Sequence, residues 1–214
     1  MPLSSASCVM MACIDAIITP VRTYMAFNDA FTIFPVLETN RLILNKLTEA
    51  DAEAYHAQQT SALLIPGRPA WQYGFETVSV DNARRSFGFA NAAWAKKNKI
   101  KWGIRLKAND GALVGQCELF DISHQSKAEI GFWLGQNFQN QGLMTECVQA
   151  AVKYSFETMG LHRIFASTAT DNTASIKMLR KAGFVQEGLL RQDAWRDESW
   201  TDSAIMSILK SDLV

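Results

Sequence analysis

The sequence has no excess of charge of either sign, because 21 Lys and Arg balance 21 Asp and Glu over 214 residues. The sequence therefore shows no polybasic footprint that would argue for a nucleic-acid partner. The four cysteines, Cys8, Cys13, Cys117 and Cys147, show neither metal-ligand spacing nor a disulfide framework, which is typical of a reducing cytoplasm. The three histidines are isolated in the sequence and predict no metal site.

Long hydrophobic runs are also scarce. The apolar run from Cys8 to Ile18 is too short to span a bilayer, is interrupted by Asp15, and has no Lys or Arg before Arg22. We expect residues 1–35 to form an N-terminal extension, either a short helix packed on the domain or a poorly ordered segment. Residues 36–214 are then expected to form one domain, cytoplasmic and without a membrane span.

The sequence contains no G-x-G-x-x-G and no G-x-x-x-x-G-K-[ST] motif, so it indicates neither dinucleotide nor nucleoside-triphosphate binding. It does contain an apolar strand, Ile130–Leu134, followed by a polar loop and a helix that begins near Gly142. Leu143, Cys147 and Ala151 recur at helical spacing. The first N–H groups of such a helix have no partner within it, so the junction is suited to bind a phosphate.

A second block, Gly160–Ile164 followed by Asp171–Phe184, adds specificity to the first. Together the two blocks resemble the GNAT superfamily of acetyl-CoA-dependent N-acetyltransferases, of the RimJ/RimL type that acetylates the N-terminus of ribosomal proteins. The pyrophosphate loop of that superfamily, Gln/Arg-x-x-Gly-x-Gly/Ala, corresponds here to Gln139–Met144. Two departures are Asn140, where this type often has glycine, and Met144 at the last small position.

The sequence predicts a mixed α/β fold in the order strand, two helices, three strands, helix, strand, helix, two strands. Asn109, Asp110 and Gly111 favour a hairpin, and Thr48 is expected to cap a helix. The resemblance implies a mostly antiparallel twisted sheet flanked by helices, with one splayed parallel strand pair. The predicted strands are Arg41–Leu44, Trp102–Lys107, Ala112–Phe120, Ala128–Leu134, His162–Thr168, Phe184–Leu190 and Ser199–Leu209.

The resemblance implies acetyl-CoA as co-substrate, held between the strand that ends at Leu134 and the strand that starts near His162, with no metal. The pantetheine arm would pair with the opened strand edge, and the pyrophosphate would reach the helix N-terminus. The residues expected to bind the cofactor are Phe132, Trp133, Leu134, Gln139, Asn140, Gln141, Gly142, Leu143, Met144, Thr145, Asn172 and Ser175.

Glu129 is the first candidate for the base that activates the amine, because Ala128-Glu129-Ile130 matches a catalytic glutamate motif in part of the superfamily. We expect it to act through an ordered water. A solvated glutamate at the start of a strand is the alternative interpretation. If the hairpin between Phe120 and Ala128 closes symmetrically, Glu118 faces Glu129, and the paired carboxylates would raise one pKa.

The acid that protonates the departing thiolate is often a tyrosine in this superfamily, but the matching position here is Leu179. The resemblance to the Rim type suggests Ser175 instead, one helical turn from Asn172, as a hydrogen-bond donor to the thiolate. The Rim type can also carry a carboxylate between its last two strands. Asp193 is the nearest match, although Ala194 falls at the expected position.

Three function classes remain open. The first is acetylation of a protein N-terminal α-amine, possible substrates being ribosomal proteins, by direct attack in a ternary complex. The second is acetylation of a small amine, antibiotic or amino acid, and the third is a non-catalytic acyl-CoA-binding module. Trp71, Trp195 and Trp200 fall in or near predicted loops and suggest an aromatic acceptor cleft. The sequence is compatible with a monomer or a homodimer.

Overall fold

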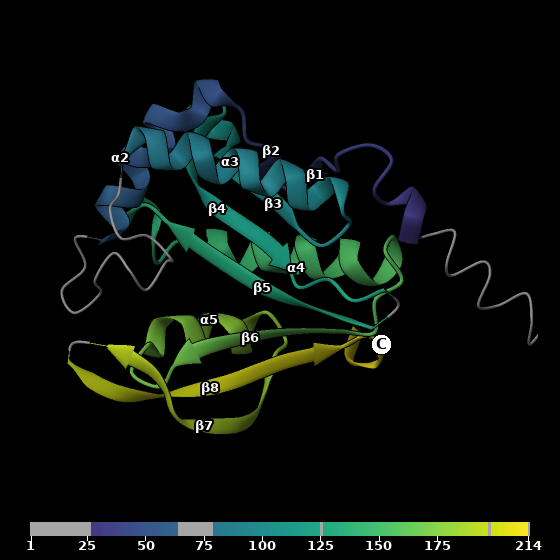
Figure 1. Cartoon of the computed structure of the whole chain (residues 1–214), viewed down its shortest axis with the longest axis vertical. Coiled ribbons are helices and arrows are strands. Elements are labelled where there is room, and N and C mark those ends of the chain that lie inside the picture. The colour runs from purple at the N-terminus through teal and green to yellow at the C-terminus, as the bar shows by residue number, and fades with distance from the viewer. Residues whose placement is uncertain (1–26, 64–78, 125, 197, 214) are drawn as a thin grey trace, which may run out of the picture.

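The computed structural model of the chain describes residues 27–63, 79–124, 126–196 and 198–213. In these ranges eight strands form one sheet, in the order β1-β2-β3-β4-β5-β6-β8-β7 (Figure 1). The strands are β1 (Leu37–Glu38), β2 (Leu42–Lys46), β3 (Ile100–Leu106), β4 (Ala112–Phe120), β5 (Lys127–Leu134), β6 (Arg163–Ala169), β7 (Val185–Arg196) and β8 (Ser199–Leu209). The α-helices are α2 (Ala52–Leu63), α3 (Val80–Ala95), α4 (Leu143–Glu157) and α5 (Thr173–Lys181). The predicted mixed α/β fold is confirmed; the short edge strand β1 was not predicted.

Local sequence chemistry explains several of these boundaries. Asp110 and Gly111 adopt positive φ angles of 49° and 73°, which closes the predicted hairpin between β3 and β4. Asn172 caps α5, and its side-chain oxygen accepts a hydrogen bond from the Ser175 N–H at 3.1 Å. Gly183 follows the end of this helix at φ 102°, as predicted for a terminating glycine.

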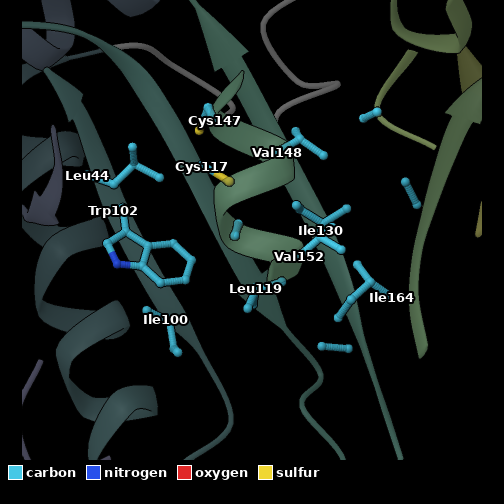
Figure 2. Close-up of a cluster of buried hydrophobic side chains, with 14 of the residues drawn as sticks. Leu44, Ile100, Trp102, Cys117, Leu119, Ile130, Cys147, Val148, Val152 and Ile164 are labelled. Carbon is cyan, nitrogen blue, oxygen red and sulfur yellow. The ribbon is translucent and has the colours of Figure 1, made fainter. Parts of the chain in front are cut away.

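The helices cover both faces of the sheet, with α2 and α3 on one side and α4 on the other (Figure 1). Figure 2 shows Cys147, Val148 and Val152 of α4 among side chains of the sheet, including Cys117 and Ile130. Cys147 is fully buried, and burial raises the pKa of its thiol. A buried, protonated thiol suits a small core residue rather than a nucleophile, as the sequence predicted.

The segment before β1 belongs to the packed fold. Phe27 and Phe31 are 4% and 8% exposed, and the Phe31 ring lies 4.6 Å from that of Trp94. The Tyr154 hydroxyl donates to the Ala30 carbonyl at 3.0 Å, which joins α4 to the segment. These contacts are all made by residues from Phe27 on; the predicted apolar run from Cys8 to Ile18 lies outside the described residues. We therefore propose that the packed domain starts no later than Phe27, rather than at residue 36.

β5 and β6 are the one parallel pair within the described ranges, and they stay paired for only three residues. Lys127–Glu129 pair with Arg163–Phe165. Beyond that point β5 pairs only with β4, up to Leu134, and β6 pairs only with β8, up to Ala169. Figure 1 shows the two strands starting side by side and then diverging. The splayed pair that the resemblance implied is thus present. No helix of the described part is both long and apolar enough to cross a membrane.

Candidate active site

A cavity of about 750 Å³ lies where β5 and β6 separate. Its wall includes residues of both strands, of the N-terminus of α4 and of α5. β7 contributes Asp193 and Ala194. The splay therefore collects side chains that are far apart in the sequence. The predicted site residues that line it are Glu118, Phe132, Trp133, Leu134, Gln139, Asn140, Gly142, Leu143, Met144, Thr145, Asn172, Ser175 and Asp193. Glu129 and Gln141 are not part of this lining.

The N-terminus of α4 presents backbone donors to the cavity. Gly142 is the N-cap at φ 75°, a left-handed conformation that favours glycine. The first intrahelical hydrogen bond runs from the Glu146 N–H to the Gly142 carbonyl at 3.1 Å. The N–H groups of Leu143, Met144 and Thr145 accordingly have no acceptor within the helix, and the helix dipole adds positive potential there.

The loop before α4 is held by its own side chains. Gln139 donates through Nε2 to the Leu134 carbonyl at 2.9 Å, and Gln141 donates to the Asn137 carbonyl at 2.8 Å. Asn140 has φ 60°, which explains why an asparagine can stand where related sequences often have glycine. In this loop the glutamine side chains shape the backbone, so the backbone rather than the side chains is available to a ligand.

The loop is also fastened from the β1–β2 turn. Arg41 pairs with Glu146 on α4, with Nε to Oε2 at 2.7 Å, and its Nη1 donates to the Gln141 carbonyl at 2.9 Å. Thr39 donates from Oγ1 to Glu146 Oε1 at 2.6 Å. Sequence reasoning missed the ion pair between Arg41 and Glu146, because the two residues are 105 positions apart and form no local pattern.

Glu129 occupies the last paired position before the splay. The Ser167 backbone N–H, on the stretch of β6 that no longer pairs with β5, favours the ionised form of the Glu129 carboxylate. Burial raises the pKa of Glu129, the Ser167 N–H opposes that shift, and the charges of Asp121 and Asp193 add to it. Two of the predicted carboxylates, Glu129 and Asp193, are therefore close enough to interact electrostatically.

The predicted pairing of Glu118 with Glu129 is wrong. Glu118 pairs with Gly131, and Glu129 pairs with Phe120, so the register is shifted by two residues from the symmetric hairpin. The connection between the strands causes the shift: Asp121 takes φ 49° and the Ser123 N–H bonds the Lys127 carbonyl. Glu118 instead faces two ammonium groups, Lys99 Nζ at 3.4 Å and Lys101 Nζ at 4.0 Å.

Behind Glu118 lies a buried polar cluster that sequence reasoning also missed. Burial lowers the pKa of Lys101 to about 8, with the Glu118 charge opposing that shift. Lys101 Nζ donates to Ser86 Oγ at 3.2 Å. Gln116 accepts hydrogen bonds from the Tyr55 hydroxyl and, at 3.3 Å, from Trp133 Nε1. Lys101 and Gln116 both line the cavity, so this cluster forms its wall on the β3–β4 side.

Other predicted features have simpler outcomes. Trp195 and Trp200 form a cross-strand pair on the β7–β8 hairpin, with ring centroids 5.4 Å apart and more than half of each side chain exposed. Trp71 lies outside the described residues. Among the residues described, no group of three or more His, Cys, Asp or Glu side chains could hold a metal ion.

Comparisons with known proteins agree with this geometry. The family model for the acetyltransferase (GNAT) domain matches residues 41–185. The chain is 33% identical over 180 residues to the uncharacterized N-acetyltransferase YoaA of Bacillus subtilis (strain 168), covering 83% of this chain and 98% of YoaA. It is 32% identical over 181 residues to the ribosomal protein uS5-alanine N-acetyltransferase of Escherichia coli (strain K12), covering 82% of this chain and 91% of that protein.

Solved structures share the fold. RimL, a ribosomal L7/L12 alpha-N-protein acetyltransferase solved in complex with coenzyme A, has a TM-score of 0.72 to this chain at 20% identity. The similarity covers 82% of this chain and 98% of that one.

Proposed function

The chain belongs to the GNAT family of N-acetyltransferases, and from that premise we propose that it transfers the acetyl group of acetyl-CoA to a protein N-terminal α-amine. The amine would attack the thioester directly in a ternary complex. The observation that carries the proposal is the cavity at the β5–β6 splay, which brings the N-terminus of α4 together with two carboxylates, Glu118 and Asp193.

The residues around the splay fit acetyl-CoA. The N–H groups of Leu143, Met144 and Thr145 suit the negative pyrophosphate, as a helix N-terminus does generally. Beyond Glu129 the edges of β5 and β6 that face each other are no longer paired, and such edges suit the amide groups of a pantetheine arm. These donors and acceptors would orient the thioester toward the acceptor side of the cavity.

Glu129 is our choice for the group that takes the proton from the amine. Its raised pKa brings a carboxylate closer to the range of a useful base. Because Glu129 is not part of the cavity lining, the proton would reach it through a water, while Asp193 lies on the cavity surface itself. Glu118, held between two ammonium groups, is better suited to balance charge than to receive a proton.

Transfer of the acetyl group from the thioester to the amine needs no further reactant. The neutral amine nitrogen bonds to the thioester carbon, the carbon–sulfur bond breaks, and the electron pair leaves on sulfur as the coenzyme A thiolate. Ser175 lines the cavity beside the Asn172 cap and can donate its hydroxyl to that thiolate. The proton released by the amine is taken up through Glu129 or by the thiolate.

The choice of a protein N-terminus as acceptor is supported by relatives named as ribosomal-protein acetyltransferases. A small amine is the second candidate, since a spermidine N(1)-acetyltransferase of Vibrio cholerae is 29% identical over 100 residues. The Asp193 carboxylate on the cavity wall would suit either kind of cationic acceptor.

A panel assay tests the proposal. The protein would be incubated with acetyl-CoA and, separately, with N-terminal peptides of ribosomal proteins, the same peptides blocked at the α-amine, and small polyamines, with thiol release as the readout. We expect turnover with free peptides and none with blocked peptides. Turnover with polyamines and not with peptides would show that the acceptor is a small amine and not a protein N-terminus. Binding of acetyl-CoA without turnover on any amine would favour a non-catalytic binding module.

A further inference from the structure

Glu146 stands at an electrostatically unfavourable place for a protein that binds a pyrophosphate. It lies in the first turn of α4, the helix whose N-terminal N–H groups face the cavity. Burial raises the pKa of Glu146, but hydrogen bonds from Thr39 and Arg41 and the Arg41 charge outweigh burial and lower it. Glu146 is therefore ionised at neutral pH, and a carboxylate there repels a bound phosphate.

Arg41 binds this carboxylate through both its backbone and its side chain. The Arg41 backbone N–H donates to Glu146 Oε1 at 2.9 Å, and its side chain pairs with Oε2 at 2.7 Å. The same guanidinium reaches the Gln141 carbonyl at 2.9 Å, one residue before the helix cap. A Cβ added at Gly142 would lie 3.6 Å from Arg41 Nη2. One side chain thus holds the loop on the residue before Gly142 and on the helix four residues after it.

We propose that Arg41 is a positioning residue that, with Glu146 as its anchor, fixes the cofactor loop so that the N–H groups of α4 face the cavity. The proposal rests on the proposed binding of acetyl-CoA at this loop. Neither Arg41 nor Glu146 lines the cavity, so both act through the loop and not by contact with the phosphates. Because Arg41 turns the Gln141 carbonyl to itself, that oxygen is kept away from the negative ligand.

The first test compares Arg41→Ala with Arg84→Ala. Arg84 is a matched control, because its side chain is also 46% exposed and also makes an ion pair, with Asp81 at 2.9 Å. By calorimetry, Arg41→Ala should weaken acetyl-CoA binding roughly 10-fold or more, the range set by charge-assisted hydrogen bonds. Arg84→Ala should leave that affinity unchanged. Arg41→Lys keeps the positive charge but cannot contact the Glu146 carboxylate and the Gln141 carbonyl at the same time. Its acetyl-CoA affinity should therefore lie between those of Arg41→Ala and the unmodified protein.

The second test is the sign of the effect of Glu146→Gln. If Arg41 acts only as a positive charge near the phosphates, removing the Glu146 charge should tighten acetyl-CoA binding. If Arg41 positions the loop, Glu146→Gln should weaken binding, because the anchor of the guanidinium is lost. We expect weaker binding, with KM for acetyl-CoA raised and kcat at saturating acetyl-CoA retained.

Two results would overturn the inference: tighter binding by Glu146→Gln, or unchanged affinity in a folded Arg41→Ala variant. Backbone hydrogen exchange keeps the test decisive if affinity falls for another reason. Exchange should accelerate at residues 141–145 in Arg41→Ala and not in Arg84→Ala. Failure of the proposed function gives a different signature, since the unmodified protein itself would then not bind acetyl-CoA.

Discussion

Glu118 lies directly across from Gly131 in the ladder between β4 and β5, where the missing side chain leaves room beside the carboxylate. A Cβ at Gly131 would come within 3.6 Å of Glu118 Oε1 and 3.3 Å of the Phe120 ring. Glu129 lies two pairs further along, across from Phe120. The cavity region therefore has separate carboxylates with different partners, and they should respond differently to substitution and to pH.

Glu129→Gln should remove most of the catalytic rate. A positioned base contributes typically about 10² to 10⁴-fold, so kcat should fall within that range while acetyl-CoA affinity is kept. In the unmodified protein, kcat should fall as the pH drops through the raised pKa of Glu129, because the carboxylate must be ionised to accept the proton. Steady-state rates over a range of pH, with calorimetry for acetyl-CoA, measure both effects.

Thermal melting separates this role from a structural one. Because the folded state raises the pKa of Glu129, its contribution to stability is complete below the unfolded pKa and is lost as the pH rises through the folded pKa. At neutral pH the ionised group costs stability, so Glu129→Gln should melt no lower than the unmodified protein. A lower melting temperature together with weaker acetyl-CoA binding would identify a structural glutamate, and Asp193 would become the next candidate.

Lys101 should make the stability of the fold depend on alkaline pH. Burial lowers its pKa in the folded state to about 8, so the unfolded chain binds more protons above that value. The free energy of unfolding should therefore rise as the pH increases from about 8 toward the ordinary lysine pKa of about 10.4. Denaturant titrations across this window should show the rise in the unmodified protein and its loss in Lys101→Met. The exposed Lys153 offers the control, and Lys153→Met should keep the rise.

Local chemistry made much of the fold predictable. The Asn109-Asp110-Gly111 turn, the periodicity from Leu143 and the Asn172 cap each depend on residues close in sequence, and the structure contains all three features. The position of the cavity was anticipated from the resemblance to the GNAT superfamily, which implied a ligand between the strand that ends at Leu134 and the strand that starts near His162.

Long-range contacts were beyond the sequence pattern. The register of β4 and β5 goes with the turn at Asp121 and Ser123. A slip of two residues keeps every side chain on its face, so alternation cannot detect it. Arg41 and Glu146 are 105 residues apart in the sequence, and Lys101 and Glu118 face each other through the register of β3 and β4, which includes an irregularity at Ile104 and Arg105. A single sequence contains no local sign of such pairs.

Gly142→Val should weaken acetyl-CoA binding by roughly tenfold or more, because a β-branched residue cannot hold φ 75° and the first N–H groups of α4 would turn away. Gly111 gives a matched control: its φ is 73°, and a Cβ there would meet nothing within 4 Å. Both variants should lose about 1 to 3 kcal/mol of stability through strain. Calorimetry on the two folded variants should show weaker acetyl-CoA binding for the Gly142 variant alone. Equal acetyl-CoA affinities would show that this loop is not part of the cofactor site.

Phe31→Ala should destabilise the protein by about 3 to 5 kcal/mol, the usual cost of emptying a buried phenylalanine site. Phe31 is 8% exposed and packs against Trp94, whereas Ile33, two residues later, is 81% exposed. Ile33→Ala should therefore change the free energy of unfolding by less than about 0.5 kcal/mol. Denaturant titration of the two variants locates the start of the domain. A large difference means that the segment from Phe27 is part of the core; matching stabilities would put the boundary back at residue 36. Acetyl-CoA affinity should be the same in both variants, because neither residue lines the cavity.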